Sequence, residues 1–593
     1  MRKRWRLTPF DSGRIAQLQQ AAGIPHVVAQ LLLSRGVYDP AAVRMFLDAK
    51  LSGLREPELL PGVTAAADRV HAAIAARRKI VIYGDYDADG MTGAAILLTC
   101  LKLLGADCSY YVPNRLEEGY GLNTEALRNL RERGAELVVS VDCGITSVEE
   151  AELAKEIGIE LIITDHHEFA ESLPDAAAVV HPRLPGSSYP FGGLCGAGVA
   201  LKLAWAICQR ASQAKKVTEP LRNFLLSAVG LAAIGTVADM VPLIDENRIL
   251  VRHGLNSLKL CPPVGLQALM QVCKLTDKPA LGSEDIGFTI APRINAAGRF
   301  GQAQLAVELL TTDNRTRALQ LAEYIHELNN SRDSIERSIQ LAATKQAKEE
   351  FDPENDGALI LAGKGWHPGV IGLVAGRLAE KFQVPVVMIA LDATGVKPGV
   401  GSARSPNGIN LHHALTACSE HLLGYGGHAA AAGLKVEENR IEAFRNAFLD
   451  YAAAEAGPSG MRGSELRIDA EGPFCQLTTE VVRQIESLAP FGMGNPRPVL
   501  CATGVTLSEA PKRIGGGERH LSLKLSHART PMRCVGFGFG DDCESITKAS
   551  GPLDIAFKPV INDFGGRQRV EIQLVDWRRS ESPAAALAAA AVS

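Results

Sequence analysis

Residues 79–90 read KIVIYGDYDADG, an apolar run that passes directly into Asp85, Asp87 and Asp89. Residues 160–167 repeat the arrangement, because ELIIT is followed by Asp-His-His. In an open α/β sheet, residues just past the carboxyl ends of parallel strands line the ligand crevice. Carboxylates and imidazoles crowded there repel one another and are costly to desolvate unless a cation pairs with them. The sequence therefore predicts a metal site at the edge of a parallel sheet, and with it a metal-dependent hydrolase.

Strand and helix patterns alternate around these two stretches. We expect strands at 79–83, 137–141 and 160–164, with helices at 92–104 and 147–157. Such alternation is typical of βαβ units and a parallel sheet. The pattern is expected to continue to about residue 310.

Two further structural units are expected beyond that point. Residues 315–350 carry apolar side chains at spacings of three and four, as in a long amphipathic helix. Such a helix either connects two lobes or packs within one domain, and the pattern leaves both open. A second α/β unit follows, with strands at 358–362 and 384–390 and a helix at 370–381.

The C-terminal part changes to alternating residues, such as Leu521, Leu523 and Leu525, with Gly515–Gly517 and Gly565–Gly566 as hairpin turns. This predicts a small antiparallel barrel or sandwich. Its segment 505–535 holds six basic residues and two acidic ones, which suits either a phosphate backbone or an ordinary solvated hairpin. The expected organisation is an N-terminal extension (1–60), a parallel-sheet catalytic domain (61–314), a connecting helix (315–350), a second α/β domain (351–460), the barrel (465–578) and a disordered tail (583–593).

The composition is that of a globular protein, with 46% hydrophobic and 22% charged residues among 593. Because the net charge is -4, any nucleic-acid contact must come from local basic patches. The twelve cysteines contain no C-x-x-C pair, so neither a zinc ribbon nor a disulfide framework is predicted. The basic start precedes no apolar signal core, and no span is expected to reach transmembrane length. These features predict a cytoplasmic protein with no membrane segment.

Two more aspartates join the predicted metal ligands. Asp142 ends the strand at 137–141, and Asp239 ends an apolar stretch that is likewise interpreted as a strand. An EF-hand is excluded, because its twelfth position would be Ile96 instead of glutamate. Mixed carboxylate and imidazole ligands suit Mn²⁺, and carboxylates with water suit Mg²⁺. Two such ions about 3.5–4 Å apart would clamp the oxygens of a phosphoryl displacement.

The motifs GDYDADG (84–90), VDCG (141–144) and DHH (165–167) together resemble the DHH phosphoesterase superfamily. Within it, the chain is most similar to the RecJ family of bacterial single-strand-specific 5′→3′ exonucleases. The resemblance covers essentially the whole chain and implies a DHH domain, a DHH-associated substrate-binding domain and a C-terminal OB fold. Five further stretches carry it: 111–115, 118–122, 292–299, 401–405 and 424–433.

The resemblance also implies roles for the metal-site residues. Asp87 and Asp89 would be metal ligands, Asp142 would bridge two ions, and His166 and Asp239 would complete one of them. Many superfamily members have a histidine four residues before the D-x-D pair, where this chain has Tyr83. The first ion then either has fewer protein ligands or takes Asp85. His167 is expected to orient a ligand or to contact the substrate phosphate.

Several residues are expected to hold the nucleic acid. Arginine forks match phosphate geometry, and small neighbours let a ligand approach. By resemblance, Ser402 and Arg404 belong to a pocket for the 5′ end, and Asn114 and Arg115 contact the strand near the metals. Three more substrate-binding residues are expected: Arg293, Arg299 and His428.

The activity expected from the resemblance is 5′→3′ hydrolysis of single-stranded DNA to mononucleotides, in recombination and repair. Two alternatives stay open: a DHH phosphodiesterase acting on oligoribonucleotides or cyclic dinucleotides, and a DNA-binding relative without activity. The complete set of acidic and histidine ligands argues against the latter. The expected partners are single-stranded-DNA-binding protein and a RecQ-type helicase, and the expected state is a monomer.

Overall fold

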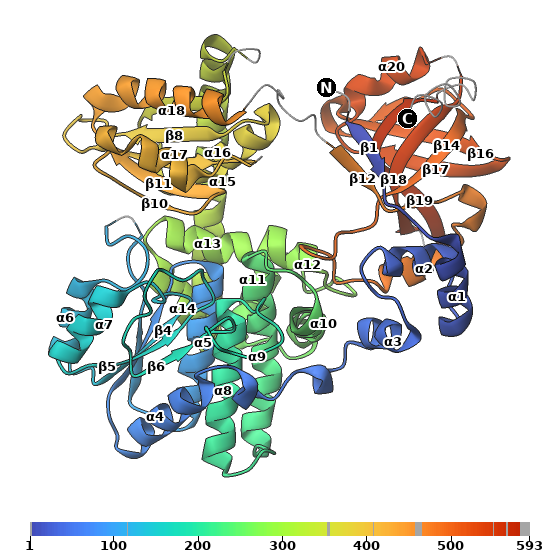
Figure 1. Cartoon of the computed structure of the whole chain (residues 1–593). Coiled ribbons are helices and arrows are strands. Elements are labelled where there is room, and N and C mark those ends of the chain that lie inside the picture. The colour runs from blue at the N-terminus through green and yellow to red at the C-terminus, as the bar shows by residue number, and fades with distance from the viewer. Residues whose placement is uncertain are drawn as a thin grey trace. The chain divides into compact units, whose positions relative to one another are not determined.

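The computed structural model of the chain describes residues 3–115, 117–352, 356–406, 408–456, 465–549, 551–564 and 567–580 (Figure 1). The chain forms two compact units. One comprises Met1–Gly53, Pro242–Ile249 and Gly463–Ser593, and the other comprises Leu54–Val241 and Leu250–Arg462. We call the first the barrel unit and the second the α/β unit.

The α/β unit contains a five-stranded parallel sheet in the order β3-β2-β4-β5-β6. The predicted strands are confirmed as β2 (Ile80–Gly84), β4 (Leu137–Val141) and β5 (Glu160–Thr164). Two more, β3 (Cys108–Tyr111) and β6 (Ala178–Val180), form the edges. β2 and β4 are buried along their whole length, which explains their continuous apolar runs.

Helices cover both faces of this sheet (Figure 1). α6 (Thr124–Glu132) and α7 (Val148–Glu156) share a core with one face. α4 (Val63–Ala75), α5 (Ala88–Leu103) and α8 (Gly196–Ser212) contact strands of the same sheet. The acidic loop after β2 therefore leads straight into α5, a central helix of the fold.

Helix α5 begins at Ala88, four residues before the expected Thr92. The reason is the Asp87 side chain, which accepts hydrogen bonds from the N–H groups of Asp89 and Gly90 and so caps the helix. Aspartate and glycine are poor residues inside helices, so their run concealed the first turn.

The expected alternation of strands and helices up to residue 310 is wrong, because β6 is the last strand of this sheet. Apolar residues in the following region recur at helical spacing, as Leu221, Phe224, Ala228 and Leu231 do. The helices are α9 (Glu219–Ala238), α10 (Asp245–Leu260), α11 (Val264–Val272), α12 (Ser283–Asp285), the π-helical turn η3 (Ile286–Ile290), α13 (Ala291–Arg299) and α14 (Ala303–Thr311).

By length and composition alone, α9 could cross a membrane, so the expectation that no span reaches that length is wrong. However, 61% of its apolar window is buried inside the protein. The helix packs against α5 and α8. This is the behaviour of a core helix in a globular fold.

The predicted long helix is confirmed as α15 (Arg315–Glu350). Its N-terminal half contacts α11 and α13, and its C-terminal half shares a core with the second sheet through Ile339, Ala343 and Ala347. Of the two interpretations left open by the sequence, the contacts support the connector.

The second sheet of the α/β unit has the order β10-β11-β9-β8-β7. The two predicted strands, β7 and β8, pair in parallel, whereas the β8–β9, β9–β11 and β11–β10 pairs are antiparallel. α16 (Pro368–Phe382) covers one face, and α17 (Leu411–Ala417) and α18 (Ile441–Ala456) cover the other. The strands are β7 (Leu359–Lys364), β8 (Val386–Leu391), β9 (Gly399–Arg404), β10 (Gly424–Gly427) and β11 (Ala431–Val436).

The barrel unit contains a seven-stranded sheet, β13-β14-β18-β19-β17-β16-β15, which an additional β14–β16 pairing closes. Most pairs are antiparallel, as predicted, but β13–β14 and β17–β19 are parallel. Gly515, with a φ of 81°, lies in the β15–β16 turn, as expected. The strands are β13 (Ala470–Glu471), β14 (Leu500–Leu507), β15 (Lys512–Ile514), β16 (His520–His527), β17 (Thr530–Gly536), β18 (Leu553–Phe564) and β19 (Arg567–Arg579). The second predicted glycine turn at 565–566 and the tail at 583–593 lie outside the described residues.

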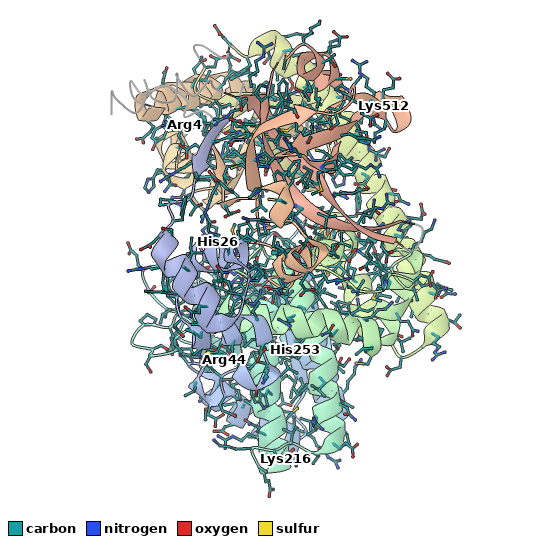
Figure 2. The ribbon with its side chains drawn as sticks, turned by 90° about the vertical axis from the view of Figure 1, so that its right-hand side faces the viewer. Arg4, His26, Arg44, Lys216, His253 and Lys512 are labelled. Atoms are coloured by element: carbon teal, nitrogen blue, oxygen red, sulfur yellow. The ribbon has the colours of Figure 1, made fainter. Side chains whose placement is uncertain are left out.

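The N-terminal residues belong to the barrel unit. α1 (Ser12–Ala22), α2 (His26–Leu33) and α3 (Pro40–Asp48) share one core with the barrel. An unpredicted strand, β1 (Arg4–Leu7), pairs in parallel with β12 (Glu465–Ile468). Figure 2 labels Arg4 on β1 and Lys512 on β15, whose side chains are exposed.

Phe557→Ala is expected to destabilise the barrel unit by about 3–5 kcal/mol, the usual cost of deleting a buried ring. Phe557 is fully buried and meets Phe474 edge to face. Chemical denaturation followed by tryptophan fluorescence measures the change. Phe537→Ala is the matched control, because Phe537 is 60% exposed and its loss leaves little cavity. Equal effects of the two substitutions would contradict the prediction.

Candidate metal centre and nucleic-acid site

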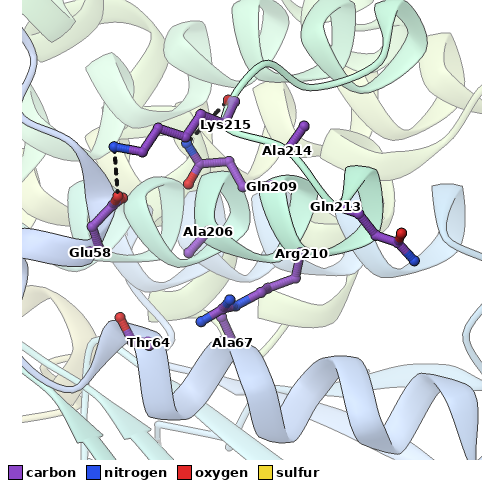
Figure 3. A pocket seen from close by; sticks show the side chains of 9 residues that line it. All are labelled: Glu58, Thr64, Ala67, Ala206, Gln209, Arg210, Gln213, Ala214 and Lys215. Carbon is purple, nitrogen blue, oxygen red and sulfur yellow. Dashed lines mark hydrogen bonds and ion pairs between the residues drawn. The ribbon is translucent and has the colours of Figure 1, made fainter.

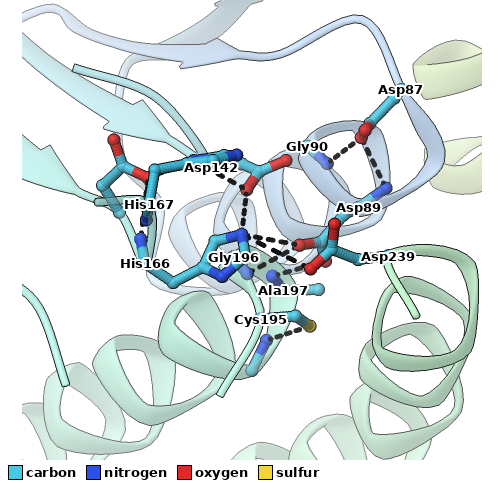
Figure 4. A network of polar contacts seen from close by, with 12 residues as sticks. Asp87, Asp89, Gly90, Asp142, His166, His167, Cys195, Gly196, Ala197 and Asp239 are labelled. Carbon is cyan, nitrogen blue, oxygen red and sulfur yellow. Dashed lines mark hydrogen bonds and ion pairs between the residues drawn. The ribbon is translucent and has the colours of Figure 1, made fainter. Parts of the chain in front are cut away.

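The loops at the carboxyl ends of three strands carry the acidic motifs, as predicted (Figure 4). Asp85 follows β2, Asp142 follows β4, and Asp165 with His166 and His167 follows β5. Asp142 has a φ of 66°, a left-handed conformation that is uncommon for a residue with a side chain. Such outliers concentrate at functional sites.

Asp239 reaches the same place by another route. It is the C-terminal cap of α9 and not the end of a strand, so the expectation of a strand there is wrong. Its Oδ2 atom nevertheless lies 3.5 Å from Nε2 of His166. The helix, and not the sheet, therefore supplies the last predicted ligand.

The carboxylate and imidazole side chains form three overlapping groups of three residues. Within each group, one possible ligand atom from each residue lies within 4.8 Å of the other two. The first holds Asp85, Asp87 and Asp142; the second holds Asp89, His166 and Asp239; the third holds Asp142, His166 and His167. Asp142 and His166 each belong to two of these groups, so together they link all three. The structure thus brings together all the residues predicted to hold metal.

Asp89 is fixed by the start of α8. The N–H groups of Gly196 and Ala197 donate to its two oxygens at 2.7 and 2.9 Å, and the side chain is fully buried. A Cβ atom on Gly196 would lie 2.5 Å from Oδ1 of Asp142. Glycine is therefore required where the helix meets the two carboxylates.

The buried carboxylates repel one another because they carry charges of the same sign. Burial, and then the neighbouring aspartates, hold the pKa of Asp142 well above its ordinary value. Burial followed by the charges of Asp89 and Asp87 raises the pKa of Asp239 to about 8. Three buried atoms, Oδ1 of Asp85, Oδ1 of Asp142 and Nε2 of His166, have no hydrogen-bond partner among the described residues. A divalent cation would relieve both the repulsion and the missing contacts, so the donor set fits one.

The two histidines differ in their surroundings. His166 Nε2 lies 3.1 Å from Oδ1 of Asp142, and burial is the main factor that lowers the pKa of His166 to about 4, so its imidazole is neutral and available to a metal. His167 Nδ1 bonds Oδ1 of Asp165 at 2.7 Å. Burial opposes a charge on His167, but the bond to Asp165 outweighs it and raises the pKa to about 9. His167 is therefore a cation beside the cluster.

Tyr83 is not placed as a ligand. It is fully buried, and its hydroxyl donates to the carbonyl of Gly121 at 3.0 Å. Asp85, and not Tyr83, lies with Asp87 and Asp142. Of the two alternatives left by the sequence, the geometry favours Asp85.

Three of the predicted phosphate-binding arginines influence one another. Burial, and then the charges of Arg115, Arg332 and Arg404, lower the pKa of Arg299 to about 9. Arg404 donates to Oγ of Ser402 at 2.9 Å. Arg115 lies over the ring of Tyr86, 4.9 Å from its centroid. Tyr86 belongs to the metal loop, so this group of positive charges adjoins the metal cluster.

The remaining predicted substrate residues are placed differently. Asn114 lies next to Gly301, just past α13. The hydrogen bonds of Arg293 go to the carbonyl of Thr289 and to Nδ1 of His326, so they do not direct it to the metal cluster. His428 is exposed and lies close enough to Glu168 to act on it, although the main cause that lowers the pKa of Glu168 is its hydrogen bond from Arg183.

Two residues to which the sequence assigned no individual role support the site. Asp165 is fully buried and accepts hydrogen bonds from the backbone of Ile145, His166 and His167. Oδ1 of Asn295 accepts from the N–H of Ala88, which ties α13 to the metal loop. Both residues lie inside stretches that carry the family resemblance. The sequence alone does not show which backbone groups their side chains bond.

Two features lie apart from this cluster. A pocket of about 540 Å³ lies between α4, α8 and the segment that follows α8, and none of the predicted site residues lines it (Figure 3). In the barrel, Lys524 pairs with Glu509, and Arg533 pairs with Glu571. The basic barrel segment is thus partly neutralised.

Comparison with known proteins places the chain. It matches the DHH family N-terminal domain at residues 79–233, the DHHA1 domain at 355–454 and the RecJ OB domain at 468–576. It is 36% identical to the single-stranded-DNA-specific exonuclease RecJ of Bacillus subtilis, over 98% of this chain and 71% of that one. The Escherichia coli RecJ is 33% identical, over 93% and 95%.

A solved crystal structure has the same fold over nearly the whole chain. The crystal structure of Thermus thermophilus RecJ in complex with Mn²⁺ superposes with a TM-score of 0.82 at 33% identity, covering 98% of this chain and 80% of that one. The corresponding complex with Mg²⁺ gives a TM-score of 0.77. With its DHH, DHHA1 and OB domains in this order, the chain belongs to the RecJ family of the DHH phosphoesterases.

Proposed function

We propose that the chain is a metal-dependent exonuclease that hydrolyses single-stranded DNA from the 5′ end and releases mononucleotides. The observation that carries this proposal is the buried cluster of carboxylates and imidazoles beside several arginines. Phosphodiester hydrolysis needs both parts, because the phosphate must be held while a water attacks it. Family membership supports single-stranded DNA as the substrate and a role in recombination and repair.

Asp85, Asp87, Asp89, Asp142, His166 and Asp239 would hold two ions, Mn²⁺ or Mg²⁺. Such ions supply a polarised phosphoryl group and an activated water when they are bound. Asp142 lies with Asp85 and Asp87 and also faces His166, so it is placed to bridge the two ions. His167, positively charged through Asp165, is suited to contact a substrate phosphate oxygen.

The substrate would be held by Arg115, Arg299 and Arg404, with Asn114, Ser402 and His428 nearby. Arg299 is a poorly solvated cation among other cations, and an anion would offset that repulsion. A terminal 5′-phosphate carries more negative charge than an internal phosphodiester. This supports a pocket for the 5′ end, and hence the direction of hydrolysis.

The wider setting also remains a proposal. The protein would act as a cytoplasmic monomer together with single-stranded-DNA-binding protein and a RecQ-type helicase. We also propose the domain limits expected from the sequence, in which the catalytic domain ends at residue 314 and the second α/β domain begins at residue 351.

A 5′-labelled and a 3′-labelled single strand, beside a duplex and a dinucleotide, test the function. The proposed function predicts immediate release of the 5′ label from the single strand, and no such release from the duplex. Preferential cleavage of the dinucleotide would favour the alternative, a phosphodiesterase of short oligoribonucleotides or cyclic dinucleotides.

Arg404→Ala is expected to raise KM for 5′-phosphorylated strands roughly 10- to 140-fold, the equivalent of one charge-assisted hydrogen bond. The difference in KM between 5′-phosphorylated and 5′-hydroxyl strands should become smaller, because only the terminal phosphate binds the guanidinium of Arg404. Steady-state kinetics on both strands measure the change. Arg210→Ala is the matched control, since Arg210 pairs with Asp68 away from the cluster. A variant that keeps its full 5′-phosphate preference would show that the end is sensed elsewhere.

A further inference from the structure

Two residues just after β6 hold consecutive peptide carbonyls of the Asp165–His167 loop. Nε2 of His181 bonds the carbonyl oxygen of His167 at 2.9 Å. Nη2 of Arg183 donates to the carbonyl oxygen of His166 at 2.6 Å. Neither residue is a ligand candidate, and neither stands in a stretch that carries the family resemblance.

The hydrogen bonds of His181 define its tautomer. Its Nδ1 accepts from the N–H of Arg183 at 3.0 Å, so the ring proton must lie on Nε2, which donates to the His167 carbonyl. His181 is fully buried, and Phe169 packs against its ring at 4.6 Å. Burial is the main factor that lowers its pKa, which keeps the ring neutral. The imidazole is therefore a fixed donor with a single orientation.

Arg183 makes a second contact from the same guanidinium. Nη1 donates to Oε1 of Glu168 at 2.5 Å, while Nη2 holds the His166 carbonyl. A guanidinium can serve two acceptors at once because its donors form a rigid fork. The loop is thus held on both sides of His167.

These bonds complete the anchoring of the loop. Asp165 already accepts from the N–H groups of His166 and His167 through its own side chain. His181 and Arg183 donate hydrogen bonds to the carbonyl oxygens of the same two residues. With both sides of the backbone fixed, the Cα–Cβ bond that carries the His166 imidazole has a fixed direction. Groups that hydrogen-bond a metal-ligating residue are worth about 10- to 100-fold in metal affinity, and Arg183 bonds His166 itself through its carbonyl.

We propose that His181 and Arg183 are positioning residues, which set the divalent-metal affinity of the site by holding the backbone of His166 and His167. This rests on the proposed function, because it assumes that His166 binds metal. The hydrogen bonds of His181 and Arg183 go to backbone carbonyls and to Glu168, and not to the ligand atoms, so their effect on the metal acts through the loop.

Titration calorimetry of the metal-stripped full chain with Mn²⁺ tests the proposal through a pair of variants. Glutamine places an amide N–H near the position of Nε2, whereas asparagine places its oxygen near Nδ1 and has no donor that reaches the His167 carbonyl. We expect His181→Asn to weaken Mn²⁺ binding about 10- to 100-fold and His181→Gln to keep most of it. A general loss of folding would affect both variants, and circular dichroism detects it.

Arg183 offers a second pair. Arg183→Lys keeps the charge but has no fork, so it can hold only one of the two acceptors, and Arg183→Gln removes the charge. We expect both to weaken Mn²⁺ binding, and excess Mn²⁺ to restore single-strand hydrolysis. Arg210→Ala, the surface control, should bind Mn²⁺ as the wild type does.

Unchanged Mn²⁺ affinity in His181→Asn and both Arg183 variants would overturn the positioning role while leaving the proposed function intact. Weak binding that excess Mn²⁺ cannot turn into activity would also overturn it, since the damage would then lie elsewhere. Failure of the wild type itself to bind Mn²⁺ would overturn the proposed function, and this inference with it.

Discussion

Asp142→Ala is expected to remove nearly all hydrolysis of single-stranded DNA while the strand still binds. Asp142 contributes to two of the three ligand groups, and its Oδ1 faces Nε2 of His166 at 3.1 Å. Removing it takes a carboxylate both from the group with Asp85 and Asp87 and from the group with His166 and His167. The loss of kcat should exceed the roughly 100-fold effect of a residue that only supports a ligand.

Single-turnover hydrolysis and fluorescence anisotropy measure the two quantities separately. Binding should persist because Arg299 and Arg404 are unchanged. Asp142→Asn is the informative companion: it keeps the shape beside Gly196 but loses the charge, so it should be nearly as inactive. Asp68→Ala, which removes a surface carboxylate paired with Arg210, should be fully active. An Asp142→Ala enzyme with a tenth of wild-type turnover would show that Asp142 is not the bridge.

The sequence was informative where local patterns dictate structure. An apolar run that ends in acidic residues marks a buried parallel strand and its functional end, which is why Asp85 and Asp142 could be found without a structure. Asp239 was found as a site residue although its element was misjudged. A strand and a buried helix can both have continuous apolar sequences, and periodicity separates them poorly.

Long-range contacts were beyond reach for a physical reason. The strand Arg4–Leu7 pairs with Glu465–Ile468, more than 450 positions away, and a four-residue edge strand has no local signature. His181 looks like any polar residue after a strand, and its meaning comes from the carbonyl it meets. Arg293 was chosen for its small neighbours, yet its guanidinium bonds His326 of α15 instead. Motif composition finds candidates for binding, whereas hydrogen-bond partners depend on the folded chain.

Removal of divalent metal is expected to abolish hydrolysis completely, and Mn²⁺ or Mg²⁺ should restore it. The ligand set has carboxylates and imidazoles with no thiolate, which is the preference of these ions. Without an ion, the buried carboxylates have only protonation to relieve their repulsion, as the pKa of about 8 for Asp239 indicates. Full activity of metal-stripped protein in excess EDTA would refute the metal-dependent mechanism.

The same repulsion predicts a change in stability. The pKa of Asp239 is raised from 3.8 to about 8 in the fold, so its contribution to the stability of the metal-free protein is present below pH 3.8 and is lost as the pH rises through 8. An ion takes over the role of the proton, so the gain in thermal stability from Mn²⁺ should be larger at pH 8 than at pH 6. Saturation at about 100 times Kd would add about 2.7 kcal/mol to the free energy of unfolding. Scanning calorimetry of the stripped and loaded protein at the two pH values measures both effects. An equal gain at both would mean that protons and metal do not compete for these carboxylates.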